Sequence, residues 1–400
     1  MAFESTPLKA YYFLQNRDSL SIDPWLDSAQ FFGSPRIAER IQKRITDDFL
    51  QPRGVPKFFV YGSYGSGKTH TLAHISYLLS SNPDFPAEPI YKDIAPLVAK
   101  EHFEKIHSRL LDAIGLDRIR TAAEAAADQF QGDKVQGFLT SGALPFGDQA
   151  LKVSQANVFR NLLFGGRQAQ MSWEWLKGRK TSVDDAQTLG TQKQLSDVQD
   201  FVSCLLNVGA LYKLGCKKRI VFLIDEAESF RSVTNPDSET ELKHALRLLL
   251  ENTNTYVGFI LAIQAEGGQE AIGEFFSSPD IMRRIDYEQG VIDLNGLVSG
   301  QDTAKTFMEE MLAYLVDQKS AEEAIKQETL DTVAKFFPFT EDAIEALSEH
   351  IVANQERALP SAIISWMSNA AIEAWRGRSE SAVHKLVTRE ILEATVYVDH

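Results

Sequence analysis

Apolar residues along this chain form two kinds of pattern, short continuous runs and longer segments with helical spacing. Five runs have the length and the β-branched or aromatic content of strands, and they cover residues 57–61, 89–92, 219–224, 256–263 and 290–294. The run at 219–224 (RIVFLI) is almost wholly apolar, which is typical of a strand buried on both faces of a parallel sheet. Strands that alternate with helical segments predict an α/β fold with helices on both faces of the sheet.

Helical spacing dominates the rest of the chain. Before the first strand, Ile37, Ile41, Ile45 and Phe49 recur every four residues and predict a helix over 35–50. Further helices are predicted over residues 69–79, 238–252, 302–317, 327–337, 340–354, 360–375 and 388–396. The pattern between residues 95 and 215 is also mostly helical, and it interrupts the series of strands.

These patterns divide the chain into three parts. Residues 1–50 are expected to form an N-terminal segment with a lead-in helix, residues 51–300 an α/β core, and residues 301–400 an all-α domain. The core carries a large helical insert at about residues 95–215. A chain of 400 residues is long enough for this division, because single hydrophobic cores stop growing near ~250–300 residues.

Composition narrows the classes of protein to consider. A hydrophobic content of 44% with 24% charged residues is ordinary for a soluble globular protein. The net charge of -14 argues against coating nucleic acid through bulk basicity, although it allows a local basic surface. Cys204 and Cys216 are the two cysteines and form no CxxC pair, so a reducing cytoplasm is the expected setting. The sequence shows no signal peptide and no apolar run near the ~20 residues that span a bilayer, so no membrane partner is expected.

A glycine-rich segment directly after the strand at 57–61 matches the phosphate-binding pattern G-x-x-x-x-G-K-[ST] without a gap. It consists of Gly62, Ser63, Tyr64, Gly65, Ser66, Gly67, Lys68 and Thr69. Small residues let the backbone N–H groups curl around phosphates, and the N-terminus of the following helix adds partial positive charge. Lys68 is expected to reach the β- and γ-phosphates, and the Thr69 hydroxyl to bind Mg²⁺. His70 adjoins this nucleotide site, with a packing or surface role as the alternative.

Two acids follow the apolar run at 219–224. Asp225 is expected to hold Mg²⁺, and Glu226 to polarise the attacking water. Glu228 is the alternative base, although a solvated helix position explains it more simply. An acid directly after the Mg²⁺ aspartate, with another strand between this one and the P-loop strand, indicates the additional-strand class of P-loop ATPases. ATP and Mg²⁺ are therefore the predicted ligands, held by a three-layer α/β/α P-loop NTPase fold.

The motifs and their order resemble the AAA+ superfamily, in particular the branch with origin-recognition and other initiator ATPases. The resemblance runs over about residues 30–395 and implies a homo- or hetero-oligomer. It implies that Gln264, at the end of the 256–263 strand, lies near the γ-phosphate as a sensor. It also implies that Arg283 or Arg284 acts as an arginine finger at a neighbouring subunit's γ-phosphate. A polar residue that caps a strand and a surface arginine pair are the simpler explanations.

The helices after residue 300 resemble the AAA+ lid, with one departure. Where such lids often place a second sensor arginine, shortly after a proline, this chain has Leu359, Pro360 and Ser361. Arg357 is the remaining candidate for that role. No segment after the lid-like helices corresponds to the winged-helix domain that initiators append.

A weaker resemblance concerns the helical insert. The segment 173–178 (WEWLKG) and a later Leu189-Gly190 look like ATP-binding proteins of prokaryotic phage-defence systems of the BREX type. Core packing within the insert is the alternative explanation of Trp173 and Trp175.

The function expected from these features is an ATPase that assembles through its nucleotide sites and remodels or loads a DNA or protein partner. Two short basic stretches, at 177–180 and 217–219, leave double-stranded DNA open as a partner. One alternative is a nucleotide switch that holds ADP with little turnover, and another is a scaffold or clamp that ATP closes. A small-molecule kinase is disfavoured by the acidic pair and by the lid-like helices.

Overall fold

The computed structural model describes residues 8–15, 17–50, 54–252, 256–266, 272–285, 290–354, 359–377 and 384–396. The chain forms two compact units. The unit called here the sheet unit comprises Arg40–Tyr61 and Ile75–Ile292. The other, called the helical unit, comprises Met1–Glu39, Gly62–His74 and Asp293–His400.

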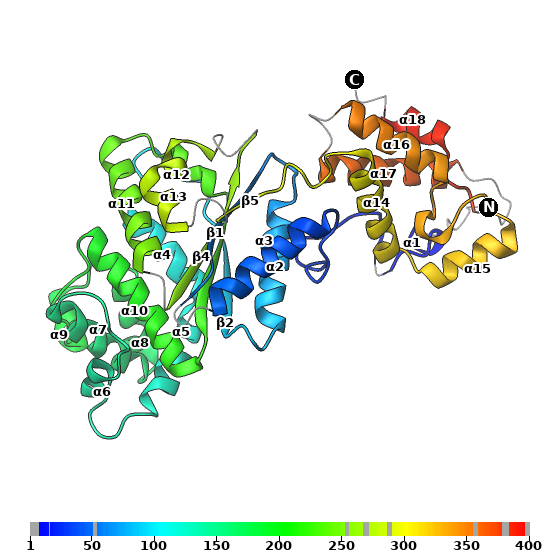
Figure 1. Cartoon of the computed structure of the whole chain (residues 1–400). Coiled ribbons are helices and arrows are strands. Elements are labelled where there is room, and N and C mark those ends of the chain that lie inside the picture. The colour runs from blue at the N-terminus through cyan, green and yellow to red at the C-terminus, as the bar shows by residue number, and fades with distance from the viewer. Residues whose placement is uncertain are drawn as a thin grey trace. The chain divides into compact units, whose positions relative to one another are not determined.

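A parallel five-stranded sheet is the framework of the sheet unit (Figure 1). Its strands are β1 (Lys57–Gly62), β2 (Ala87–Asp93), β3 (Arg219–Asp225), β4 (Val257–Gln264) and β5 (Val291–Asp293). All five coincide with the apolar runs, so the α/β fold class is confirmed. The strand order is β2-β3-β4-β1-β5, and β4 therefore lies between β3 and the strand before the glycine-rich loop, as the sequence predicts.

The inner strand β3 is buried along nearly its whole length, which explains its continuous apolar sequence. Every residue from Ile220 to Asp225 is buried. β3 pairs in parallel with β2 on one side and β4 on the other, so Asp93 lies opposite Asp225 and Val221 lies opposite Gly258. With both edges hydrogen-bonded and both faces covered, this strand fixes the position of the acid that ends it.

Helices α4 (Phe103–Ile114), α5 (Leu116–Ala127), α10 (Val198–Cys216) and α11 (Pro236–Asn252) gather on one side of the sheet (Figure 1). Between α5 and α10, the predicted helical insert contains four more described helices. They are α6 (Lys134–Thr140), α7 (Gln149–Leu162), α8 (Gly166–Leu176) and α9 (Val183–Leu189). Trp175 is fully buried and Trp173 is 7% exposed, both within the hydrophobic core of this unit. Core packing thus accounts for the two tryptophans.

Six elements of the helical unit come after the sheet strands. They are α14 (Gln301–Leu315), α15 (Gln318–Glu328), the 3-10 helix η3 (Ala334–Phe336), α16 (Glu341–Ala353), α17 (Pro360–Arg376) and α18 (Arg389–Val396). The helix predicted over 327–337 is wrong, because α15 ends at Glu328 and Thr329 has a left-handed φ of 55°. The spacing missed α15 because its buried face consists of the small residues Ala321 and Ala324.

The N-terminal residues of the helical unit pack on its C-terminal part. The Tyr12 hydroxyl donates to the carbonyl oxygen of Lys385 at 2.8 Å, and Leu14 forms an antiparallel bridge with Val316. The short helix α1 (Leu8–Tyr11) leads into these contacts. In neither unit is any described helix both long and apolar enough to cross a membrane.

Candidate functional site

The glycine-rich segment forms a tight loop between β1 and helix α3 (Lys68–Ser81), in the strand–loop–helix order that the sequence predicts. Gly65 and Gly67 have φ of 80° and 91°, a left-handed conformation that side chains strongly disfavour. A Cβ at Gly62 would lie 2.3 Å from Ser66 Oγ. The loop can close in this way only because these three positions lack side chains.

Polar groups converge inside the loop. Lys68 Nζ donates to the carbonyl oxygens of Gly62 at 3.2 Å and Ser63 at 3.0 Å. Ser66 is fully buried, and its hydroxyl has no hydrogen-bond partner among the described residues. A buried polar group without a partner is costly, by about 1–3 kcal/mol. An ammonium and an unsatisfied hydroxyl in a cradle of glycines fit a bound phosphate.

Asn295, which sequence reasoning missed, also supports the loop. Its Oδ1 accepts the backbone N–H of Ser63 at 2.8 Å. Asn295 follows β5 by two residues, and nothing in the local sequence distinguishes it from an ordinary turn residue. Tyr64, by contrast, is 76% exposed at the surface of the loop.

The two residues after Lys68 have different environments. Thr69 is half-buried in the first turn of α3, and its predicted role as a Mg²⁺ ligand stays a prediction. His70 Nε2 lies 2.9 Å from the carbonyl oxygen of Gln30, and its ring stacks on Phe32. Burial lowers the pKa of His70 to about 4, so the ring is neutral at pH 7. This environment supports the packing role that the sequence left open for His70.

The acidic pair ends β3 in the sheet unit. Asp225 is 3% exposed, and its Oδ2 accepts the Tyr91 hydroxyl at 3.0 Å. Burial, together with the Asp225 charge, raises the pKa of Tyr91, so the phenol remains a donor. Tyr91 lies on β2, in the strand beside β3, and the sequence alone could not have paired it with Asp225. Its hydrogen bond fixes the orientation of the carboxylate.

Glu226 has an unusual backbone conformation. Its φ and ψ are 56° and 34°, in the left-handed region, and its N–H donates to Asp225 Oδ1 at 3.0 Å. Such a conformation at a non-glycine residue costs on the order of 1 kcal/mol or more and often occurs at functional positions. Glu226 directly precedes the 3-10 helix η1 (Ala227–Ser232), and its side chain is exposed.

The parallel arrangement has a direct consequence for these motifs. Because the strands run in one direction, the carboxyl ends of β1, β4 and β3 lie at one edge of the sheet, with β4 in the middle. Ligands of open α/β sheets bind outside this edge. The acidic pair and the predicted sensor position at the end of β4 therefore share the edge at which a nucleotide is expected.

Gln264, the predicted sensor, is the last residue of β4, and its backbone N–H donates to Glu228 Oε2 at 2.7 Å. Glu228 is a half-buried residue of the 3-10 helix η1, and its carboxylate also bonds the neighbouring strand, a contact that the sequence did not indicate. Both residues line an open hollow with Arg231, Ala265 and Glu266. Acidic and basic side chains thus both face this hollow.

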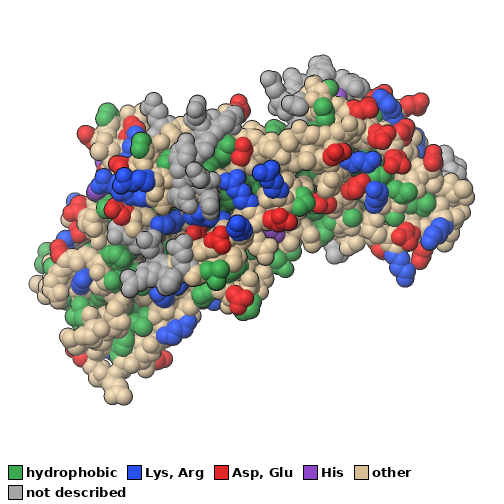
Figure 2. Space-filling view, in the orientation of Figure 1, with side chains coloured by type: hydrophobic (Ala, Val, Ile, Leu, Met, Phe, Trp, Pro, Cys, Tyr) green, Lys and Arg blue, Asp and Glu red, His purple; other side chains and the backbone are tan. Residues whose placement is uncertain are grey.

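The two arginines proposed as fingers lie on α13 (Pro279–Ile285) and differ in their contacts. Arg284 hydrogen-bonds the carbonyl oxygen of Asp280 and also Glu251 Oε2, the latter at 3.3 Å. Arg283 is exposed and forms no hydrogen bond or ion pair within the described part of the chain. Figure 2 shows Lys and Arg side chains gathered over α11 and α13. Of the pair, Arg283 is the one whose guanidinium is available to another molecule.

In the helical unit, the N-terminus of α17 contacts the glycine-rich loop. The backbone N–H of Ser361 donates to the carbonyl oxygen of Gly65 at 3.3 Å. A Cβ at Gly65 would lie only 2.1 Å from Ser361 Oγ, so the two residues are closely packed. Arg357, the sequence-based candidate for a second sensor, lies outside the described residues. The loop and this helix are thus linked through a serine where the resemblance leads one to expect an arginine.

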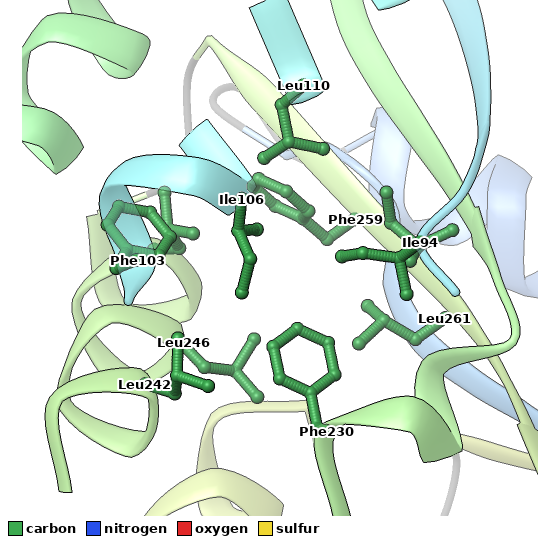
Figure 3. Close-up of a pocket in the computed structure, with 11 residues that line it drawn as sticks. Ile94, Phe103, Ile106, Leu110, Phe230, Leu242, Leu246, Phe259 and Leu261 are labelled. Carbon is green, nitrogen blue, oxygen red and sulfur yellow. The ribbon is translucent and has the colours of Figure 1, made fainter. Parts of the chain in front are cut away.

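A small cavity beside η1 in the sheet unit is not a candidate for a substrate site (Figure 3). Its volume is about 30 Å³, and all eleven lining residues are apolar. They are Ile94, Phe103, Ile106, Leu110, Ile224, Phe230, Leu242, Leu246, Leu249, Phe259 and Leu261. A space without polar partners does not hold an ordered water, and this one is too small for a nucleotide.

Comparisons with known proteins add little to this geometry. No family model matches the chain, and no curated protein matches it. Among solved structures, the chain is similar to a Walker-type ATPase of Pyrococcus abyssi, with 12% identity, a TM-score of 0.38, and coverage of 95% of this chain and 75% of that chain. A TM-score this low carries no argument about function, so the functional conclusion depends on the residues of the site.

Proposed function

We propose that this chain is a P-loop ATPase of the AAA+ type that binds ATP with Mg²⁺ and hydrolyses it. The observation that carries the proposal is the glycine-rich loop itself. Its left-handed glycines, the Lys68 ammonium within it and the unpartnered Ser66 hydroxyl form a cradle with the chemistry of a phosphate site. The acidic pair after β3 supplies the groups that hydrolysis needs in addition.

Each residue has a defined role in the proposed reaction. Lys68 balances the charge of the β- and γ-phosphates, while the Thr69 hydroxyl and the Asp225 carboxylate hold Mg²⁺. When bound there, Mg²⁺ would supply positive charge opposite the phosphate oxygens. Glu226 accepts the proton of the attacking water. Gln264 lies near the γ-phosphate as a sensor. Arg283 stabilises the transition-state charge at the site of a neighbouring subunit.

The wider role is part of the same proposal. The chain assembles through its nucleotide sites and uses ATP to remodel or load a DNA or protein partner in the cytoplasm, in DNA transactions or phage defence. Its support is the resemblance described above and the basic side chains over α11 and α13 (Figure 2). A nucleotide switch with little turnover and an ATP-closed clamp are the alternatives, and tightly bound ADP in the purified protein would favour the switch.

Two variants test the assignment of the site. We expect Lys68→Ala to weaken ATP binding by about 100-fold or more, because the charge opposite the phosphates is lost. Glu226→Gln should bind ATP as the wild type does and lose about 10²–10⁴-fold in turnover, since only the proton acceptor is removed. Binding is measured with a fluorescent ATP analogue and turnover by phosphate release. Wild-type turnover in Glu226→Gln would show that another group is the base.

A further inference from the structure

We propose that η1 clamps two described pieces of chain, the end of β4 at Gln264 and the residues 272–276 before α13, and that Glu228 and Arg231 are the positioning residues of this clamp. The inference rests on the proposed ATPase function for its consequences, although the clamp itself is a matter of contacts within the sheet unit. Three side chains of η1 make these contacts, from Glu228, Phe230 and Arg231. Each reaches a different point of these two pieces.

The first contact holds the end of β4. Glu228 Oε2 accepts the backbone N–H of Gln264 at 2.7 Å, the last residue of β4. A hydrogen bond to a charged acceptor is shorter and stronger than one between neutral groups. The carboxylate therefore fixes the backbone at the point where the proposed sensor side chain leaves the strand.

The second contact holds the piece before α13. Arg231 donates to the carbonyl oxygen of Ile272, directly before Gly273. Gly273 has φ of 86°, and a Cβ there would lie 2.9 Å from Arg231 Nε. The backbone thus passes against the guanidinium at a residue that lacks a side chain. Glu228 and Arg231 lie three residues apart, so one short helix grips both pieces.

The third contact joins η1 to the short helix that precedes the arginine-bearing helix α13. The Phe230 ring stacks on Phe275 at 5.3 Å and meets Phe276 edge-on at 5.9 Å. Both partners belong to α12 (Glu274–Ser277), which leads at Ser278 directly into α13. Another part of the Phe230 ring borders the small apolar cavity, as Figure 3 shows.

These contacts connect the proposed base to the proposed finger. Glu226 is the residue before η1 and has a left-handed backbone conformation, so a change in its φ and ψ reorients η1 directly. Because η1 holds Gln264 and α12, such a change reaches both the sensor position and Arg283 on α13. The clamp thereby couples the state of one hydrolysis site to the arginine that serves the next subunit.

Glu228→Ala and Glu228→Gln form the matched pair for the test. The glutamine keeps a carbonyl oxygen that accepts the Gln264 N–H, whereas the alanine removes the acceptor. In the full-length protein, we expect Glu228→Ala to speed hydrogen–deuterium exchange at the end of β4 by about 10-fold or more. The ATP turnover of Glu228→Ala should fall about 10–100-fold, because a small displacement of a group that is positioned for the reaction lowers the rate. Its ATP affinity should stay within about twofold of the wild type. Glu228→Gln should retain the protection and most of the turnover.

The outcomes separate the clamp from its alternatives. Wild-type exchange at Gln264 in Glu228→Ala would overturn the clamp, whatever the turnover. If Glu228→Gln were as inactive as Glu226→Gln, Glu228 would be the base and not a positioning residue. A wild-type protein without ATP turnover would overturn the proposed function, while the exchange measurement would still decide the clamp.

Arg231 provides an independent variant if Glu228→Ala fails to fold. We expect Arg231→Ala to speed exchange in α12 and to lower turnover without a change in ATP affinity, because the second contact is removed. Arg231→Lys keeps a cationic donor, so its exchange rate in α12 and its turnover should lie between those of the wild type and Arg231→Ala. Wild-type exchange and turnover in Arg231→Ala would remove this end of the clamp from the proposal.

Discussion

Single residues of this protein have backbone and protonation states that their surroundings impose. Glu226 keeps a left-handed conformation at the end of β3, and the loop glycines do so without strain. His107 of α4 is fully buried, and its Nε2 lies 2.8 Å from the carbonyl oxygen of Leu176. The carbonyl can only accept, so Nε2 carries the proton of a neutral ring. Burial lowers the pKa of His107 from 6.5 to about 4.

This buried histidine predicts sensitivity to acid. In the unfolded chain His107 binds a proton near pH 6.5, whereas in the folded chain it does so only near pH 4. The contribution of neutral His107 to the free energy of unfolding is therefore complete above pH 6.5 and is lost as the pH falls from 6.5 to 4. At pH 5 we expect His107 to cost about 2 kcal/mol of unfolding free energy. The measurement is urea unfolding at pH 7 and pH 5, with His107→Gln as the control that keeps a donor. An equal loss of stability in both proteins would contradict this role.

At the scale of elements, the ends of helices and strands carry the chemistry. β3 presents the acids, β4 ends at the residue held by Glu228, and α17 begins at the contact between Ser361 and Gly65. The contact of α17 joins the backbone N–H of Ser361 to the carbonyl oxygen of Gly65. It therefore links the helices after residue 300 to the glycine-rich loop through close packing.

A charge placed at this link should affect nucleotide binding. Because Ser361 packs against Gly65, a carboxylate at position 361 is expected to lie near the bound phosphates and repel them. We expect Ser361→Glu to bind ATP about tenfold more weakly than Ser361→Gln, which corresponds to about 1–2 kcal/mol of like-charge repulsion. The glutamine has the same size, so the difference isolates the charge. Equal affinities, measured by titration calorimetry at low and high salt, would show that α17 does not face the nucleotide.

At the scale of the whole molecule, the distribution of charge over the surface tells more about possible contacts with a partner than the net charge does. The net charge is -14, yet basic side chains gather over α11 and α13 (Figure 2). Arg283 of α13 is exposed and has no hydrogen-bond or ion-pair partner in the described part of the chain. A surface arginine that has no partner among the described residues is available to act on a second subunit. The proposed oligomer would use it in this way.

Mixing two inactive variants tests whether this arginine works between subunits. Arg283→Ala keeps an intact nucleotide site, and Lys68→Ala keeps an intact finger. If the finger acts on the neighbour, an equal mixture should recover roughly a quarter of wild-type turnover, since random assembly pairs the intact halves at that frequency. Steady-state turnover is measured over a range of protein concentrations. No recovery, with assembly confirmed by light scattering, would mean that Arg283 acts within its own chain or not at all.

Local pattern and chemistry determined much of this protein. The five strands, most helices, the glycine-rich loop and the acidic pair were all predictable, because hydrophobic spacing and short motifs depend on neighbours in the sequence. The helix at Gln318–Glu328 was missed, and one was misplaced over 327–337, because an alanine face has little apolar contrast with its surroundings.

Only the tertiary structure decided which distant residues meet. Tyr91 and Asp225 are 134 residues apart, Ser63 and Asn295 are 232 apart, and neither pair has a signal in the sequence. The different contacts of Arg283 and Arg284 likewise depend on the position of Glu251, which no local sequence pattern indicates. The physical reason is that a hydrogen bond or ion pair requires a specific distance and orientation, and strand order and helix packing set these over the whole chain.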